Sequence, residues 1–257
     1  MKLQYAVKAS QGGRSYQEDS ATVWQAAEGS GRDSVSAIEL LCVLADGMGG
    51  HAGGAIASDA VCTNFRAQFI KQNGPTRDRL KSSLDAANGA IGALVGEKPT
   101  LRGMGSTLIG VAFGGGQANW VSVGDSPLYL YRRGEMARLN EDHSMAPVLD
   151  KLVEAGRLDP EEARDDPRRH LLRSAVVGED LDLVDLAQEP WPLHQGDVVV
   201  LASDGLNSIA DIEIARIIAA FRKEGPEATA GALIQAVADA GEPHQDNTTV
   251  VVVTVGE

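Results

Sequence analysis

Two apolar runs of the sequence each lead into an Asp-Gly pair, and this constrains the fold more than any other feature. The run 40–45 leads into Asp46, and the run 198–203 leads into Asp204. Apolar runs of this length predict buried strands. A carboxylate at the end of such a strand loses hydration, so it needs a cation or strong hydrogen-bond donors. The sequence therefore predicts a fold that buries both strands and leaves their acids at the mouth of an apolar layer.

Two further acids extend this pattern into a predicted carboxylate cluster. Asp125 follows the apolar run 120–123, and Asp246 precedes a last run, 248–253. Clustered carboxylates repel one another unless divalent cations bridge them, and a site built of oxygen atoms suits Mg²⁺ or Mn²⁺. These acids predict a metal enzyme.

The charge of the chain argues against a nucleic-acid-binding protein. The chain has 23 Lys and Arg but 36 Asp and Glu, a net charge of −13, whereas affinity for a polyanion needs a basic footprint. The first residues lack the apolar core of a signal peptide, and no apolar run approaches the ~18 residues of a membrane span. We therefore expect a cytoplasmic monomer that binds neither nucleic acid nor membrane.

The two cysteines are interpreted as buried free thiols. Cys42 lies in an apolar run and Cys62 in a predicted helix, and their spacing is not the CxxC of redox or zinc sites. Cysteine outside such sites behaves as a small apolar residue.

Hydrophobic periodicity predicts strands together with two pairs of amphipathic helices. The predicted strands are 3–9, 21–24, 38–45, 107–113, 118–123, 128–131, 136–139, 198–202 and 248–253, and the predicted helices are 53–72, 80–94, 148–156, 160–164, 212–221 and 228–240. The glycines at 114–116 are interpreted as a hairpin turn. This order favours stacked antiparallel sheets with helices outside. Because no linker-like segment interrupts the sequence, we expect a single domain spanning 1–257.

Six short motifs give the chain a family resemblance. They are GRSYQEDS (13–20), DGMGGHAGG (46–54), GSTL (105–108), VGDS (123–126), ASDGL (202–206) and DNTT (246–249). Their order and content resemble the metal-dependent PPM/PP2C protein serine/threonine phosphatases of bacterial type. The resemblance covers nearly the whole chain. It implies an α+β fold in which a central antiparallel β-sandwich is flanked by pairs of helices on both sides, with a flap at about 145–180.

The resemblance also implies roles for the acids. Asp46 would bridge two metal ions, and Gly47 would contribute its backbone carbonyl. Asp204 and Asp246 would hold the first ion, and Glu18 would reach the second. Two alternatives remain open at this point. Asp46 could cap a turn, and Glu18 could lie in a solvated loop.

Three further roles follow from the resemblance, each with an alternative. Arg14 would clamp the phosphate, or form a surface salt bridge. His51 would be the general acid for the leaving group, or orient a water, or pack the turn. Asp125 would bind a third ion with Asp204, or cap a strand end. The arginines between 164 and 173 are either a solvated loop or a surface for phosphopeptides.

The implied reaction is hydrolysis of phosphoserine or phosphothreonine by a water activated between two Mn²⁺ or Mg²⁺ ions. The Cys-x5-Arg loop of cysteine phosphatases is absent. The expected partners are phosphorylated proteins, substrates of a cognate bacterial Ser/Thr kinase. The alternatives are a phosphatase specific for an anti-anti-sigma-type regulator and a catalytically silent phosphoprotein-binding module.

Overall fold

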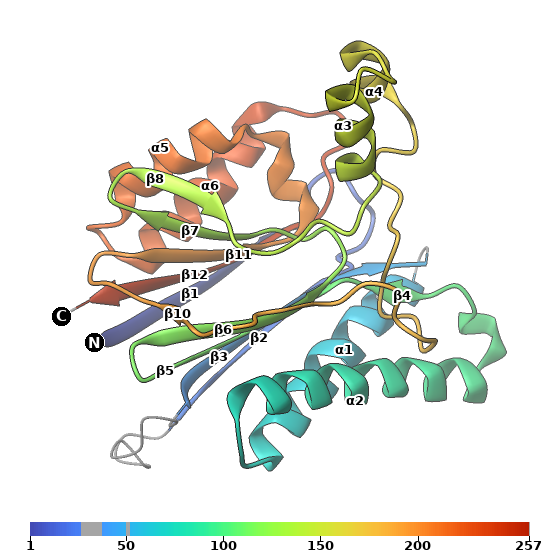
Figure 1. Ribbon diagram of the computed structural model, residues 1–257, viewed down its shortest axis with the longest axis horizontal. Coiled ribbons are helices and arrows are strands. Elements are labelled where there is room, and N and C mark those ends of the chain that lie inside the picture. The colour runs from blue at the N-terminus through green and yellow to red at the C-terminus, as the bar shows by residue number, and fades with distance from the viewer. Residues whose placement is uncertain (27–37, 50–51, 257) are drawn as a thin grey trace.

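The strands of the chain form two antiparallel sheets that face each other (Figure 1). The computed structural model describes residues 1–26, 38–49 and 52–256. One sheet has the order β1 (Lys2–Ser10), β12 (Thr248–Gly256), β11 (Val198–Ala202), β7 (Leu128–Arg132) and β8 (Glu135–Arg138). The other has the order β10 (Trp191–Pro192), β6 (Gln117–Val123), β5 (Leu108–Gly114), β3 (Ile38–Met48) and β2 (Asp19–Gln25), with β4 (Gly105–Ser106) beside β3 and β9 (Asp185–Leu186) beside β6.

Helices cover the outer faces of both sheets (Figure 1). The sheet that contains β3 carries α1 (Ala52–Lys71) and α2 (Thr76–Glu97), and the sheet that contains β12 carries α5 (Asp211–Phe221) and α6 (Pro226–Ala240). Two shorter helices, α3 (Ala146–Glu154) and α4 (Pro160–Asp165), project from one end as an arm. Short 3-10 turns, η1 (Pro99–Leu101) and η2 (Asp204–Ser208), complete the helical segments. The predicted α+β fold with four layers is confirmed.

The apolar runs are continuous because β3 and β11 are covered on both faces. In β3, Leu41 and Val43 pack toward α1 and α2, whereas Cys42 and Leu44 pack between the sheets. This alternation is the two-residue period of a strand. Continued by one step, it places Asp46 on the side that faces the other sheet. The fold therefore delivers this acid to the end of the layer between the two sheets.

The predicted strand 38–45 is too short, since β3 continues to Met48. Gly47 pairs with Ser106 and Met48 with Gly105, so β4 supplies partners beyond the apolar run. The Asp-Gly pair consequently lies within the strand. The short strands β4, β9 and β10 have two residues each, too few for a periodic pattern to reveal.

Other local predictions are confirmed. The turn between β5 and β6 has φ of 57° at Gly115 and 73° at Gly116, the positive values of a tight hairpin. Cys42 and Cys62 are both buried and free. Within the described residues, no helix is long and apolar enough to cross a membrane.

Candidate metal and phosphate site

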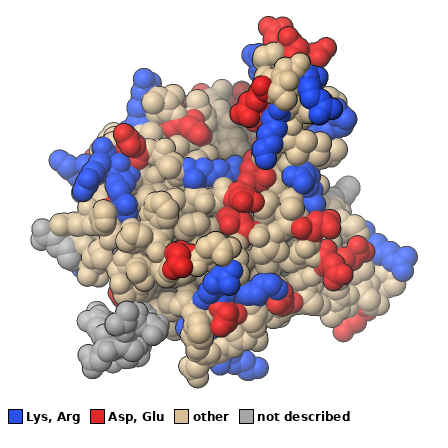
Figure 2. All heavy atoms as spheres, viewed as in Figure 1, with Lys and Arg blue, Asp and Glu red and all other residues tan. Residues whose placement is uncertain are grey.

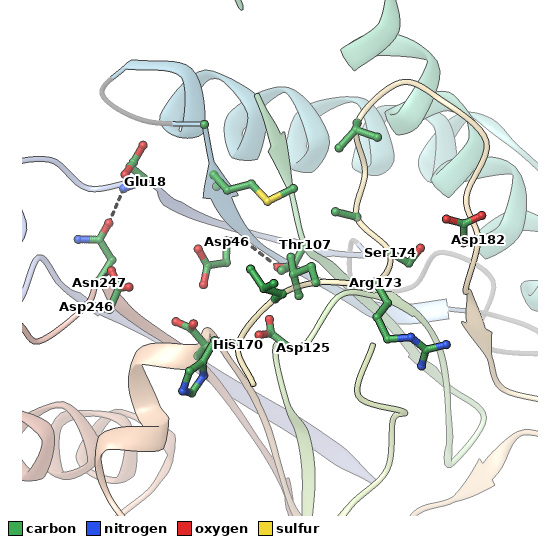
Figure 3. A pocket seen from close by; sticks show the side chains of 18 of the residues that line it. Glu18, Asp46, Thr107, Asp125, His170, Arg173, Ser174, Asp182, Asp246 and Asn247 are labelled. Carbon is green, nitrogen blue, oxygen red and sulfur yellow. Dashed lines mark hydrogen bonds between the residues drawn. The ribbon is translucent and has the colours of Figure 1, made fainter. Parts of the chain in front are cut away.

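A cavity of about 640 Å³ opens where the strands of the sandwich end near the arm (Figure 3). It is lined by the loop before β2, the end of β3, the loop after β6, the start of η2, the loop before β12 and the segment 170–182. The site residues predicted from the sequence that lie along it are Arg14, Glu18, Asp46, Gly47, Asp125, Asp204 and Asp246. His51 lies outside the described residues.

The carboxylates that line this cavity repel one another electrostatically. Burial, followed by the charges of neighbouring aspartates, holds the pKa of Asp46 well above its usual value. Burial raises the pKa of Asp125 to about 7, and Asp204 adds to this shift. Burial and Asp246 also raise the pKa of Asp204. The acids arrive from separate strands and loops around one opening (Figure 3), as expected for a cluster that cations stabilise.

Two buried oxygen atoms support a cation site. Within the described structure, Glu18 Oε1 and Asp19 Oδ1 are buried without a hydrogen-bond partner. A buried carboxylate oxygen without a donor is costly unless a cation balances it. No three side chains of His, Cys, Asp or Glu in the described structure are arranged to hold an ion by themselves. The donor set fits a metal that also takes backbone carbonyls and water, the usual ligands of Mg²⁺.

Gly47 is required at its position by close packing. A Cβ atom there would lie 2.1 Å from the carbonyl oxygen of Gly54 and 2.6 Å from that of Glu18. The Gly47 N–H donates to the same Glu18 carbonyl over 3.1 Å. A Cβ at Gly54 would lie 2.3 Å from Glu18 Oε1. The two glycines thus let Glu18 approach the end of β3.

Arg14 lies at the rim of the cavity. Its guanidinium donates to Asp246 Oδ2, and this hydrogen bond is the main cause of the raised pKa of Arg14. The side chains are 52% and 37% exposed, respectively. An ion pair at this exposure adds little stability, but it fixes the guanidinium beside one of the predicted metal ligands.

Neutral side chains hold the acidic loops in place. Asn247 accepts a hydrogen bond from the Glu18 N–H over 2.7 Å and donates to the carbonyl oxygens of Gln11 and Tyr16. Thr107 Oγ1 accepts from the Asp46 N–H over 3.0 Å. Asn247 and Thr107 both belong to recognised motifs, but the sequence alone predicts no role for either residue.

Hydroxyl groups hold the Asp19 side chain and the loop that carries Asp125. Asp19 Oδ2 accepts a hydrogen bond from Ser203 Oγ over 2.7 Å, and burial raises the Asp19 pKa to about 6. The Ser126 hydroxyl, in the loop that carries Asp125, lies 2.7 Å from Thr107 Oγ1. Because Thr107 also binds the Asp46 backbone, this contact joins the loop after β6 to β3.

Three of the four arginines between 164 and 173 fall into two groups. Arg168 pairs with Asp166 over 2.7 Å and Arg169 with Asp150 over 2.8 Å, so basic and acidic side chains lie side by side on the arm (Figure 2). Arg173 and His170 line the cavity instead. A positive charge on His170 would oppose the rise in the Asp204 pKa that burial and Asp246 cause. His170 is not predictable from the sequence, because a single histidine in an irregular charged stretch carries no signal.

Comparisons with known proteins agree on one family. The family model described as "Protein phosphatase 2C" matches residues 30–231. The serine/threonine protein phosphatase PstP of Mycobacterium tuberculosis is 36% identical over 224 residues, which cover 87% of this chain and 42% of PstP. The chain thus spans less than half the length of that relative. Protein phosphatase PhpP of Streptococcus pneumoniae is 34% identical over 183 residues, covering 69% of this chain and 72% of PhpP.

A solved structure extends the similarity to the fold. The catalytic domain of PstP, in complex with two manganese ions, superimposes with a TM-score of 0.77 at 33% identity. The match covers 99% of each chain.

Proposed function

Because this chain belongs to the protein phosphatase 2C family, we propose that it hydrolyses phosphoserine and phosphothreonine in proteins. The observation that carries the proposal is the cavity in which Asp46, Asp125 and Asp204 meet, with pKa values raised by burial and by one another's charge. Groups with perturbed pKa values in a cleft are typical of catalytic sites. A site of this kind suits a reaction in which bound cations carry the positive charge.

Two Mn²⁺ or Mg²⁺ ions fit the donor set. Asp46 would contact both ions, with the Gly47 carbonyl as a further ligand. Asp204 and Asp246 would hold the first ion and Glu18 the second, a role supported by the unpartnered Glu18 Oε1. When bound, the cations supply a water nucleophile at neutral pH and neutralise phosphoryl oxygens.

A third ion and a phosphate clamp complete the proposed site. Asp125 would bind the third ion with Asp204, since the charge of Asp204 acts directly on the pKa of Asp125. Arg14 would bind the phosphate. A guanidinium has five N–H donors in a planar fork, and the Arg14 hydrogen bond to Asp246 uses Nη2. The remaining N–H groups can donate hydrogen bonds to phosphate oxygens at the cavity rim.

We assign His51 as the donor of a proton to the leaving serine or threonine oxygen. A general acid contributes about 10² to 10⁴ in rate with a poor leaving group and little with a good one. His51→Gln should therefore slow hydrolysis of a phosphoserine peptide by at least about 10², while hydrolysis of p-nitrophenyl phosphate changes little. Initial rates on both substrates at saturating Mn²⁺ measure the difference. Equal losses on the two substrates would instead indicate that His51 holds the metal-binding turn.

The direct test of the proposed function compares phosphopeptides. With Mn²⁺, the protein should release phosphate from phosphoserine and phosphothreonine peptides and much less from a phosphotyrosine peptide of the same sequence. Fluorescence anisotropy measures binding of the same peptides, and so distinguishes binding from catalysis. Binding without phosphate release would favour the silent module, and release from a phosphorylated anti-anti-sigma-type protein alone would favour the regulator-specific phosphatase.

The proposed partners follow from this activity. They are phosphorylated proteins, the substrates of a cognate bacterial Ser/Thr kinase, acted on by a cytoplasmic monomer. We further propose that the whole chain, 1–257, is a single phosphatase domain. Its segment 145–180 would act as a flap, since residues 170–174 of that segment line the cavity.

A further inference from the structure

The carboxylate of Asp125 depends for its position on the backbone of a short loop. Asp125 lies between β6 and β7 in the segment 124–127, and Gly124 has a φ of 106°. A Cβ at Gly124 would lie 2.6 Å from Thr107 Cγ2, so this turn needs glycine. Whatever fixes the backbone of this loop therefore fixes the direction in which Asp125 points.

Residues of the segment 138–143 form hydrogen bonds to the backbone of this loop. Arg138 Nη2 donates to the Asp125 carbonyl over 2.7 Å. Asn140 donates to the Ser126 carbonyl over 3.0 Å. Arg138 is itself held by Asp142, whose Oδ2 lies 3.1 Å from Arg138 Nη1. The backbone on the C-terminal side of the Asp125 side chain is thus tied to one neighbouring segment.

His143 makes the contact on the other side of Asp125. Its Nδ1 accepts a hydrogen bond from the Gly124 N–H over 3.3 Å, and its own N–H donates to the Gly124 carbonyl over 3.1 Å. The side chain is 2% exposed, and burial lowers its pKa. The neutral ring therefore carries its proton on Nε2.

The Nε2 atom shows that packing alone does not explain this histidine. In the described structure it is buried without a hydrogen-bond partner, and the nearest carboxylate oxygen in an ion-pair contact, Glu141 Oε2, is 3.9 Å away. A buried unpaired donor is costly, and an apolar side chain of similar shape would avoid the cost. The hydrogen bond that Nδ1 accepts from the loop carrying Asp125 offsets this cost.

The backbone of His143 extends the link to the cavity wall. Its carbonyl accepts a hydrogen bond from the Arg173 N–H over 2.7 Å, and Ser144 forms an antiparallel bridge with Leu172. Both Leu172 and Arg173 line the cavity. His143 therefore connects the loop that carries Asp125 to another segment that lines the same cavity.

We propose that His143 and Arg138 are positioning residues that orient Asp125 toward the metal it binds. The inference rests on the proposed metal role of Asp125. Partners that orient a ligand without touching the metal commonly contribute 10- to 100-fold to metal affinity. The contribution should be confined to the ion that Asp125 holds, because Asp46 and Asp246 are fixed by other neighbours.

The test uses a matched pair of substitutions at His143. Asn and Leu have the same branched shape, but only Asn places an oxygen acceptor where Nδ1 lies. We expect His143→Leu to weaken binding of the Mn²⁺ that Asp125→Asn removes by about tenfold, with the other ions unchanged, and His143→Asn to stay close to the wild type. Titration calorimetry of the whole, metal-stripped chain measures Mn²⁺ affinity without substrate. A failure of the proposed phosphatase activity is therefore distinguished from a failure of this inference.

A double-mutant cycle separates positioning from general structure. Asp125→Asn should remove one bound Mn²⁺, and adding His143→Leu to it should weaken Mn²⁺ binding no further. If His143→Leu does not fold, Arg138→Met, at a position 26% exposed, should give the same confined loss. The inference is overturned if Asn and Leu at position 143 bind Mn²⁺ equally, if losses add in the cycle, or if Asp125→Asn binds like the wild type.

Discussion

Removal of divalent metal should lower hydrolysis of a phosphothreonine peptide by at least about 10³-fold, because the cations stabilise the transition state by several kcal/mol. The charges that line the cavity explain the size of this effect. Its cationic side chains are Arg14 and Arg173, with His170 when protonated, against the carboxylates of Glu18, Asp46, Asp125, Glu179, Asp180, Asp182, Asp204 and Asp246. Without cations, this cavity repels a phosphate dianion.

The measurement is phosphate release after treatment with a chelator, followed by titration with Mn²⁺ or Mg²⁺. Either ion should restore activity. Ca²⁺ should bind but restore little, since its looser coordination positions water poorly. A protein that remains fully active in excess chelator would contradict the mechanism.

The architecture could be predicted because the sequence carries periodic signals over long segments. β3 and β11 read as unbroken apolar runs since helices cover one face of each sheet and the opposite sheet covers the other. The end of β3 could not be predicted. Its last residues pair with β4, a partner of two residues about sixty positions away, and no local pattern contains that information.

The candidate site likewise contains some residues that the sequence predicts and others that it does not. Asp46 and Asp204 stand out in the sequence because each follows the end of an apolar run, and Asp125 and Asp246 flank strands. His143 and Arg138 act through the backbone of a loop that they meet only in the folded chain. A single polar residue of this kind does not alter the hydrophobic periodicity of the sequence, so only the hydrogen-bond geometry of the folded chain indicates its role.

The metal-free protein should lose stability as the pH rises. Burial and neighbouring charge raise the pKa of Asp46, and the pKa values of Asp19 and Asp125 rise to about 6 and about 7. A carboxyl whose pKa is higher in the folded state binds more protons folded than unfolded between the two values, so stability falls as pH increases there. The window extends from the ordinary value of 3.8 to about 7.

Asp46→Asn should therefore stabilise the metal-free protein while removing its activity. The new amide carries no charge, and it can donate to Asp204, which lies within hydrogen-bond range of Asp46. One pKa unit corresponds to about 1.4 kcal/mol, and 1 kcal/mol to roughly 2–4 °C in a chain of this size. We expect the melting temperature at pH 7.5 without metal to rise by about 3 °C or more, and activity with Mn²⁺ to fall by at least about 10³.

Melting curves with and without Mn²⁺ distinguish the two effects of Asp46→Asn. Mn²⁺ should raise the melting temperature of the wild type, because a ligand that binds the folded state stabilises it, and should raise that of the variant much less. Asp59→Asn, at an exposed position on α1, is the matched control and should change neither property. A metal-free variant that melts below the wild type would show that the Asp46 carboxylate stabilises the fold by itself, and the interpretation of the cluster as a set of mutually repelling metal ligands would then be wrong.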